Sequence, residues 1–329
     1  MSEAGPSRAL RLVGRFAALV LGGVLVFAAA AKALDPQAFA EQIHAEGLDR
    51  FASASRMALL ALALEAGLGL ALMLGVRRLR VLLPASALVA FFVFLTARTY
   101  WRSTHGGAVG SSCGCFGNLV ERSPAEALWT DLLLLVPPLL LAFVGRGDQR
   151  QGGRGVGWRL GVAALGAVLV AGFAWRAPGL PLDDLATRLK PGVQASALCA
   201  GTGADRVCLG GVLPDAQNGR QLVVLADLDP AFAADVDRLN AYVQAGHGPT
   251  LAVLTAASPD DERKFYWRFG PTFKIATAPP GLLRPLYRRL PRSFLLEGGV
   301  VRQTWSGLPP LDRLAQAGPG MAPGLQTTP

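Results

Sequence analysis

The chain has 329 residues, of which 51% are hydrophobic and only 17% charged, and its formal net charge is +9. This length suggests about two domains, and the apolar composition excludes a chain that is water-soluble throughout. Most basic residues flank apolar runs, so we interpret the charge as a determinant of membrane topology and expect no nucleic-acid partner.

Five apolar runs are long enough to cross a hydrocarbon layer of about 30 Å as helices. They cover residues 12–31, 52–74, 79–97, 125–144 and 156–175. Arginines before the first run and small residues at its end also fit a secretory signal peptide, so cleavage near Ala33 is an alternative.

Arginine positions predict the orientation of these spans. Basic residues crowd the N-terminus, the second connection and the fourth connection, namely Arg8, Arg11, Arg15, Arg77, Arg78, Arg80, Arg146, Arg150, Arg154 and Arg159. By the positive-inside rule these segments lie inside. The third connection and everything after Arg176 then face outward, which predicts a multi-pass protein of a bacterial inner membrane with a periplasmic C-terminal domain.

Two features stand out within the spans. Glu65 is an acidic residue deep in the second run, where a carboxyl group needs a partner, a proton or water, and Lys32 and Arg98 are candidate partners. Its role is either a structural clasp between helices or a proton relay. The fourth span begins with Ser123 in a capping-box pattern, so Cys113 and Cys115 lie near the outer boundary of that helix.

After about residue 176 the pattern of apolar and polar residues changes. Short apolar runs alternate with amphipathic ones, which predicts an α/β domain. The expected strands are residues 222–225, 250–255 and 272–275, the expected helices are 232–243, 260–269 and 281–289, and the expected hairpin has strands 293–296 and 300–305.

Cys113 and Cys115 are separated by one glycine and form the candidate reactive pair. Thiol–disulfide exchange needs one attacking thiolate and a second sulfur that resolves the mixed disulfide, and this pair supplies both. A structural loop disulfide is a second interpretation. Cu(I) binding, with His105 nearby, is a third, although no further ligand pair at metal-site spacing stands out and we expect no cofactor.

The membrane half resembles the MauE branch of the DoxX-like membrane proteins over roughly residues 8–145. The resemblance rests on three stretches, Ala31 to Pro36 with Phe39, Leu64 to Gly67, and Cys113 to Gly117. It implies a four-helix membrane domain associated with periplasmic thiol chemistry. Methylamine-utilisation members of the family are linked to maturation of a disulfide-rich dehydrogenase subunit.

The outer domain is similar to thioredoxin-like proteins of the TlpA type. Leu290-Pro291-Arg292 before an apolar strand looks like the cis-proline of that fold, so Pro291 is a site candidate. The redox Cys-x-x-Cys of the family would follow the strand at 222–228, where this sequence has Asp229-Pro230-Ala231-Phe232. The active-site role of that motif is therefore not carried over.

Cys199 and Cys208 lie upstream in a glycine-containing loop whose closure by a disulfide is easy. They form either a structural disulfide that staples the N-terminal edge of the domain or a second redox pair.

These observations predict a multi-pass helical membrane bundle, four-helix DoxX/MauE-like plus a fifth span, followed by an α/β thioredoxin-like domain. The expected parts are residues 8–145, a fifth helix and linker at 146–189, a thioredoxin-like periplasmic domain at 190–316 and a disordered tail at 317–329. The expected function is thiol–disulfide redox support of exported proteins, with Cys113 and Cys115 as the redox pair and Glu65 as a candidate proton relay. The expected partner is a periplasmic thioredoxin-like protein or an exported client. A non-catalytic assembly factor with structural disulfides and a Cu(I)-handling membrane protein are the alternatives.

Overall fold

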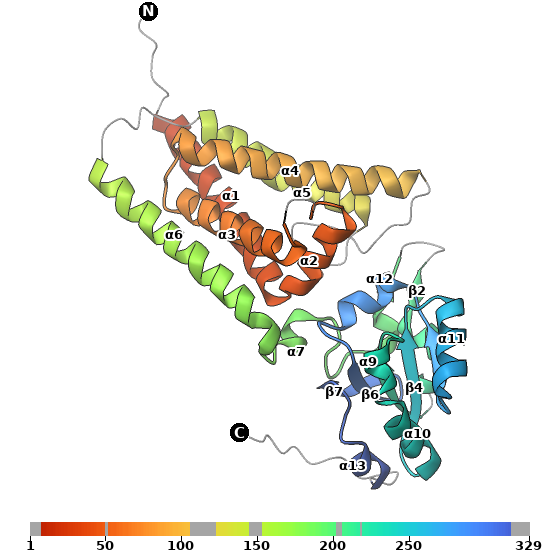
Figure 1. Cartoon of the computed structure of the whole chain (residues 1–329). Helices are drawn as coiled ribbons and strands as arrows, with labels where there is room; N and C mark the ends of the chain where they lie inside the picture. Colours follow the sequence, from red (N-terminus) through yellow and green to blue (C-terminus); the bar gives the residue numbers. More distant parts are fainter. Residues whose placement is uncertain are drawn as a thin grey trace, which may run out of the picture. The chain divides into compact units, whose positions relative to one another are not determined.

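The structure, a computed structural model, describes residues 8–49, 52–105, 123–144, 153–201, 206–217 and 219–316 (Figure 1). The chain divides into two compact units, Met1–Ala186 and Thr187–Pro329.

The first unit contains five helices long and apolar enough to cross a membrane, as the sequence predicts. They are α1 (Arg8–Leu34), α3 (Ala54–Met73), α4 (Leu79–Thr104), α5 (Pro124–Val144) and α6 (Gly153–Arg176). A short helix, α2 (Pro36–Ala45), follows α1 and was not predicted. After α6 come a 3-10 turn at Ala177–Gly179 and the short helix α7 (Asp183–Ala186).

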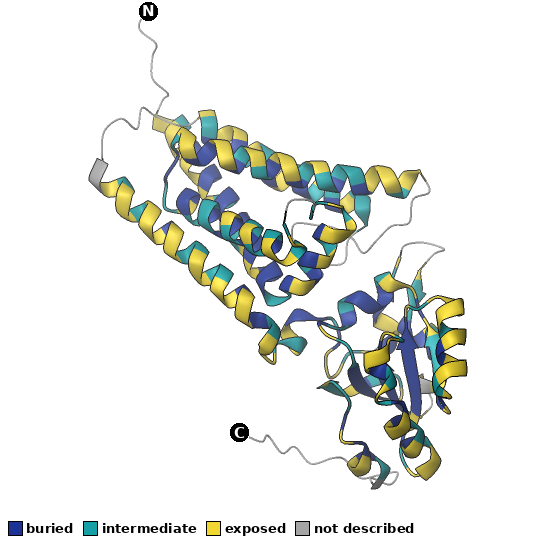
Figure 2. Cartoon of the chain, in the orientation of Figure 1, coloured by how far each residue is buried: buried dark blue, intermediate teal, exposed yellow. Residues whose placement is uncertain are grey.

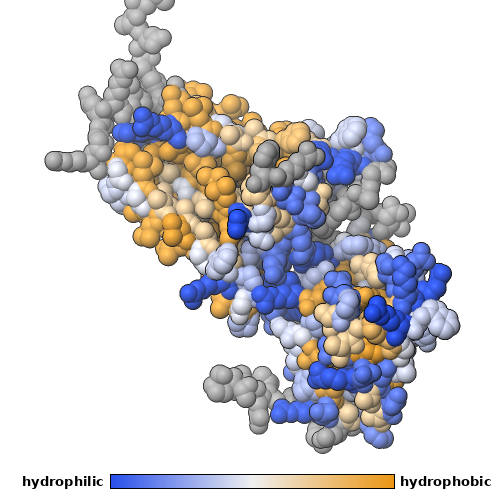
Figure 3. All heavy atoms as spheres, viewed as in Figure 1, coloured by the Kyte–Doolittle hydropathy of each residue, from blue (hydrophilic) through white to orange (hydrophobic). Residues whose placement is uncertain are grey.

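The bundle buries small and apolar side chains at its centre. α1 packs against α3 and α5, α3 packs against α6, and α4 packs against α5. By contrast, large apolar side chains such as Phe16, Leu133 and Val168 are 70%, 65% and 68% exposed. Figure 2 shows exposed residues along most of α6, and Figure 3 shows that the outer face of this unit is largely hydrophobic. So much exposed apolar surface is favourable only against lipid, which identifies this unit as membrane-spanning.

α1 and α3 approach each other most closely at two glycines. A Cβ atom on Gly22 would lie 2.5 Å from the carbonyl oxygen of Gly69, and a Cβ atom on Gly69 would lie 2.8 Å from that of Gly22. Small residues at a crossing point let two membrane helices pack backbone against backbone. The position of Lys32 on α1 relative to Glu65 on α3 therefore depends on this contact.

We expect Gly22→Ala to destabilise the protein by about 1–3 kcal/mol, because the new methyl group forces the two backbones apart. Gly23→Ala is the matched control, since a Cβ atom there meets nothing within 4 Å. The measurement is equilibrium unfolding of the purified protein in micelles. Equal changes for the two variants would show that the close contact contributes nothing.

The second unit is built on a five-stranded mixed sheet in the order β5-β4-β3-β6-β7. Its strands are β3 (Arg220–Leu225), β4 (Thr250–Thr255), β5 (Lys274–Thr277), β6 (Arg292–Glu297) and β7 (Val300–Ser306). β3, β4 and β5 run parallel, and β6 and β7 form an antiparallel hairpin on the other side of β3. This arrangement confirms the α/β class that the sequence predicts for this part of the chain.

Alternating residues of β3 enter two cores on opposite faces of the sheet. Leu222 and Val224 pack with residues of α10 (Val236–Ala245), α11 (Pro259–Phe269) and α13 (Leu311–Gln316). Val223 and Leu225 pack with residues of α12 (Pro280–Leu283) and of a small hairpin, β1 (Cys199–Ala200) and β2 (Val207–Cys208), near which lies the short helix α8 (Leu209–Val212). The central strands β3, β4 and β6 are thus mostly buried, as Figure 2 shows.

Three predicted elements have different limits. The helix expected at 232–243 is two helices, α9 (Pro230–Ala233) and α10. The helix expected at 281–289 stops as α12 at Leu283 and continues only as a 3-10 turn at Arg284–Leu286, because Pro285 has no backbone N–H to continue the α-helical pattern. The strand expected at 272–275 begins two residues later, as β5.

Candidate functional site

A buried ion pair joins α1 to α3 inside the membrane unit. Lys32 Nζ donates to Glu65 Oε1, and the side chains are only 3% and 0% exposed. Lys32 lies in the last turn of α1, and Glu65 lies in the middle of α3. The sequence offered Lys32 and Arg98 as partners of Glu65, and the structure selects Lys32.

Two aromatic rings complete the surroundings of the Lys32 ammonium. Nζ lies 5.0 Å from the ring centre of Phe39 on α2 and 4.4 Å from that of Phe92 on α4. A desolvated cation over an aromatic face gains about 2 kcal/mol. Asp35 orients α2, because its Oδ1 accepts from Ala38 N at 3.1 Å while Pro36 occupies the first turn. Four helices thus contribute to one charged centre.

Glu65 has unused acceptor capacity. Its second oxygen, Oε2, is buried and has no hydrogen-bond partner among the residues that the structure describes. A buried carboxylate oxygen without a donor is costly and favours uptake of a proton or a water molecule. This geometry suits either role considered for Glu65, the clasp between helices or the proton relay.

Arg98 does not contact Glu65, so the prediction of Arg98 as a possible partner of Glu65 is wrong. Its Nη1 instead donates to the Glu46 carboxylate and, at 3.4 Å, to the Glu46 backbone oxygen. Arg102 Nη1 is 3.9 Å from the same carboxylate. Glu46 caps the C-terminal end of α2, so these contacts fasten α2 to the far end of α4.

A second, exposed pair follows α2. His44 Nδ1 and Asp49 Oδ2 are 2.6 Å apart. The hydrogen bond to Asp49 and the charge of that carboxylate raise the pKa of His44. The same hydrogen bond lowers the pKa of Asp49.

Cys113 and Cys115 lie outside the described residues, but the helix ends on both sides of their loop are defined. α4 ends at Thr104, and His105 stacks on Trp101 with ring centres 4.7 Å apart. At the start of α5, Ser123 N donates to Glu126 Oε2 at 2.8 Å and Glu126 N donates to Ser123 Oγ at 3.2 Å. This reciprocal pair is the predicted capping box.

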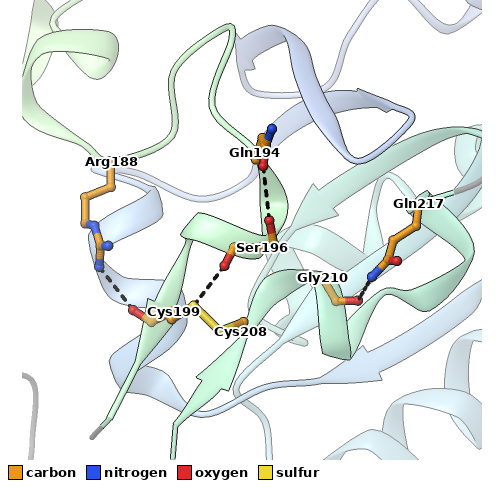
Figure 4. The surroundings of a disulfide bond; sticks show 7 residues. All are labelled: Arg188, Gln194, Ser196, Cys199, Cys208, Gly210 and Gln217. Atoms are coloured by element: carbon orange, nitrogen blue, oxygen red, sulfur yellow. Dashed lines mark hydrogen bonds between the residues drawn. A yellow bond between two sulfur atoms is a disulfide. The ribbon is translucent and has the colours of Figure 1, made fainter.

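Cys199 and Cys208 form a disulfide bond in the second unit (Figure 4). They are direct cross-strand partners in the β1–β2 hairpin, which the sequence did not predict because each strand has two residues. Arg188 Nη1 donates to Cys199 O at 3.2 Å, and Cys199 Sγ lies 3.1 Å from Ser196 O. Cys199 is buried, so its sulfur is poorly placed for direct attack by a large partner.

We expect the double variant Cys199→Ser/Cys208→Ser to lose about 2.5 kcal/mol of stability, from the loop-closure entropy of a disulfide with a sequence separation of 9. The measurement is denaturant unfolding of the full chain in micelles. Reductant should destabilise the wild type to a similar extent and have a smaller effect on the double variant, which retains only the Cys113 and Cys115 pair. A variant as stable as the wild type would exclude the staple role.

The predicted cis-proline is present, since the Leu290–Pro291 peptide bond is cis. Arg292, the next residue, pairs in register with Leu225 at the end of β3. Pro291 therefore lies at the same edge of the sheet as the loop that leads from β3 into α9. In that loop Asp229 caps α9, and its Oδ1 accepts from Phe232 N at 2.8 Å. A carboxylate cap, and no cysteine, thus lies in the loop that follows β3.

Arg292 has a structural role that was not predicted from the sequence. Its side chain is 1% exposed and donates to Thr187 Oγ1 at 2.6 Å, to Leu286 O at 2.9 Å and to Leu189 O at 3.2 Å. It holds the first residues of the unit against the segment before Pro291. An arginine directly after a proline at the start of an apolar strand was the available signal.

No group of three His, Cys, Asp or Glu side chains suited to a metal ion occurs within the described parts of the chain. The Cu(I) interpretation concerns Cys113 and Cys115, which those parts do not include.

Comparison with known proteins finds a family match for part of the chain and several similar solved structures. No curated protein sequence matches the chain. A putative thiol:disulfide interchange protein DsbE from Chlorobium tepidum is 20% identical, with a TM-score of 0.30, and the match covers 39% of this chain and 93% of that one. The bacterioferritin comigratory protein of Xanthomonas campestris, solved as trapped intermediate/ligand complexes, is 16% identical, with a TM-score of 0.26, and the match covers 36% and 86%.

The family match concerns the membrane unit and covers less than half of the chain. It includes the Lys32–Glu65 pair, Phe39, Phe92 and both Cys113 and Cys115. Residues 10–144 match the family of the methylamine utilisation protein MauE.

Proposed function

We propose that the protein is a membrane thiol–disulfide redox protein that supports disulfide formation or maturation of exported proteins. The observation that carries the proposal is the MauE match, because the matched segment contains Cys113-Gly114-Cys115. The same segment contains a charged centre buried among membrane helices. The family name suggests a client in methylamine utilisation, such as a disulfide-rich dehydrogenase subunit.

In the proposed reaction the Cys113–Cys115 disulfide accepts two electrons and two protons from two client thiols. One client thiolate attacks a sulfur of the pair, and the S–S bond of the pair breaks as a mixed disulfide forms. The second client thiolate then breaks the mixed disulfide, which leaves an oxidised client and the reduced pair. A disulfide then reoxidises the pair by the same exchange, and its source is Cys199–Cys208 or an external thioredoxin-like protein.

The arginine distribution supports the proposed location. Arginines flank the ends at which α1, α4 and α6 begin, so these ends lie on the cytoplasmic side by the positive-inside rule. The Cys113–Cys115 loop and the unit after α6 then face the periplasm of a bacterial inner membrane. Disulfide exchange with exported proteins takes place in that compartment.

The Lys32–Glu65 pair has a supporting role in this proposal. Each exchange step moves protons between sulfurs, and Glu65 Oε2 is a buried acceptor that can hold one. Lys32 keeps the neighbouring charge balanced when Glu65 is ionised. The pair is thus a candidate store for one proton within the membrane unit.

The test is to trap thiols in intact cells and measure the redox state of each cysteine pair. We expect Cys113 and Cys115 to be partly reduced while client proteins are being oxidised, and their replacement by Ser to leave the clients reduced. A pair that remains fully oxidised, together with unchanged clients in the Ser variant, would refute the proposal.

A second candidate function is a non-catalytic assembly factor. It is favoured by the cysteine pattern of the second unit, which resembles thioredoxin-like proteins. This unit has Asp229 where those proteins have a redox cysteine, and its own two cysteines form the disulfide of the β1–β2 hairpin. Such a protein would hold a client against the surface around Pro291. Under this alternative the Ser variants of Cys113 and Cys115 would still support maturation, whereas Pro291→Ala would not.

A further inference from the structure

The outer face of α11 carries two adjacent exposed aromatic side chains. Among the described residues of the second unit, the large apolar side chains that are exposed are Tyr266 and Trp267, at 55% and 83%. The opposite face of the helix packs into the core through Phe265. Trp267 forms no ring contact or hydrogen bond within the part of the chain that the structure describes. A unit that buries its other large apolar side chains but exposes this pair presents a binding surface.

Basic side chains surround Trp267 on the same face of the helix. Figure 2 shows exposed residues along the outer face of α11. Residues three, four and seven positions apart share one face of a helix, and here they border a hollow of about 540 Å³. The hollow is lined by Asp260, Arg263, Lys264, Trp267 and Arg268.

The positive charge of this face is concentrated near Trp267. In the last turn of α11, Arg268 has no ion pair among the described residues, and its guanidinium carbon lies 5.2 Å from the ring centre of Phe269. The other two basic residues form exposed ion pairs, which are weak and leave both cations able to bind an outside anion. These pairs have N–O distances of 3.4 Å and are Asp260–Arg263 and Asp261–Lys264.

A short connection ties the second unit to the membrane spans. α6 ends at Arg176, and the second unit begins at Thr187. Even fully extended, the residues between them reach at most about 40 Å. A lipid surface is therefore always within reach of the second unit, and the tether raises the effective concentration enough for a weak contact to persist.

Trp and Tyr together with Lys and Arg are the residues enriched where proteins meet lipid head groups. We propose that the face of α11 around Trp267 binds anionic head groups at the surface of the bilayer in which the chain is anchored. The rings of Tyr266 and Trp267 lie among the head groups, and the basic side chains of the same face contact the phosphates. The proposal is independent of the proposed redox function.

The test is hydroxyl-radical footprinting of the full chain in lipid nanodiscs that hold a single chain each. Mass spectrometry of the peptide that contains Trp267 gives the oxidation rate of its indole ring. In discs with equal parts of dioleoyl phosphatidylglycerol and dioleoyl phosphatidylcholine, we expect a rate at least about threefold lower than in discs of phosphatidylcholine alone. High salt should remove most of the difference, because it screens the charges. Trp305 on β7 is the internal control and should be oxidised equally in both discs.

Arg268→Gln should lower the ratio of protected to unprotected Trp267 about fivefold, as expected for one basic side chain near an anionic surface. Arg238→Gln is the matched control, because it removes the same charge from an exposed position on α10, and we expect less than about a twofold change. Equal oxidation of Trp267 in the two kinds of disc, or equal effects of the two variants, would overturn the proposal. Protection that appears only when two chains share a disc would also overturn it, since the face would then bind a second copy.

Discussion

Replacing either Cys113 or Cys115 by Ser should reduce disulfide exchange by the purified protein to the background rate. A single cysteine cannot form the intramolecular disulfide that accepts the two electrons of a dithiol client. The assay follows oxidation of a reduced dithiol peptide by the oxidised full chain in micelles. When the peptide is instead supplied in its disulfide form, the Ser variant that retains the more reactive sulfur should attack it and form a mixed disulfide, with the second peptide sulfur leaving as a thiolate. Mass spectrometry then identifies that sulfur.

The double variant Cys199→Ser/Cys208→Ser is the control for this prediction. It should retain the first, stoichiometric round of peptide oxidation, because that round uses only the membrane pair. Loss of the first round in this variant, with full activity in both single variants, would move the redox chemistry to the second unit.

Breaking the buried ion pair should have the largest effect on stability. We expect Lys32→Met to cost about 3–5 kcal/mol, because it leaves the Glu65 carboxylate buried without its partner cation. Arg98→Met is the control. It breaks a more exposed pair, in which the arginine is 39% exposed, and should cost at most about 1 kcal/mol. Both values come from equilibrium unfolding in micelles.

The double variant Lys32→Met/Glu65→Met separates a structural role from a chemical one. Removing both charges avoids an unpaired buried ion, so most of the stability should return. If Glu65 also stores a proton, the folded double variant should exchange disulfides more slowly than the wild type, and the pH dependence of its exchange rate should differ. A double variant as unstable as Lys32→Met would contradict the ion-pair explanation. A stable double variant with an unchanged exchange rate and pH profile would show that the pair only joins the two helices.

The membrane spans could be predicted from the sequence because length and hydropathy are local properties. The limits of α1, α3, α5 and α6 agree with the apolar runs to within about one turn, and α4 continues through its polar last turns to Thr104. α2 was not predicted, since a ten-residue helix between two spans gives a weak periodic signal. Its start was nevertheless encoded by Asp35 and Pro36, a recognisable cap and first turn.

The partner of Glu65 could be predicted only as a choice between two cations. Sequence shows that a buried carboxylate needs a counter-charge, but it does not show which side chain reaches it. The fold decides: α2 brings Glu46 to Arg98, and the close crossing of α1 and α3 leaves Lys32 for Glu65. Phe92 could not be chosen among the apolar residues of α4, because only its position over Lys32 distinguishes it.

In the second unit the buried strands were predictable from strong local signals, whereas the cis-proline was predicted from the resemblance of the stretch around Pro291 to thioredoxin-like proteins. The β1–β2 hairpin was not, because its strands are too short to show an alternating pattern. The disulfide between Cys199 and Cys208 is therefore a better guide to that hairpin than its apolar residues are.

One measurement tests the redox account most directly. The oxidised Cys199→Ser/Cys208→Ser variant, in which the second pair cannot reoxidise the first, is mixed with a reduced dithiol client peptide. The reaction is stopped by alkylation at successive times, and the mass of the peptide that contains Cys113 and Cys115 is measured. The account predicts that both cysteines become alkylated in step with client oxidation, one reduced pair for each disulfide formed. Client oxidation while Cys113 and Cys115 remain disulfide-bonded, or no client oxidation at all, would contradict it.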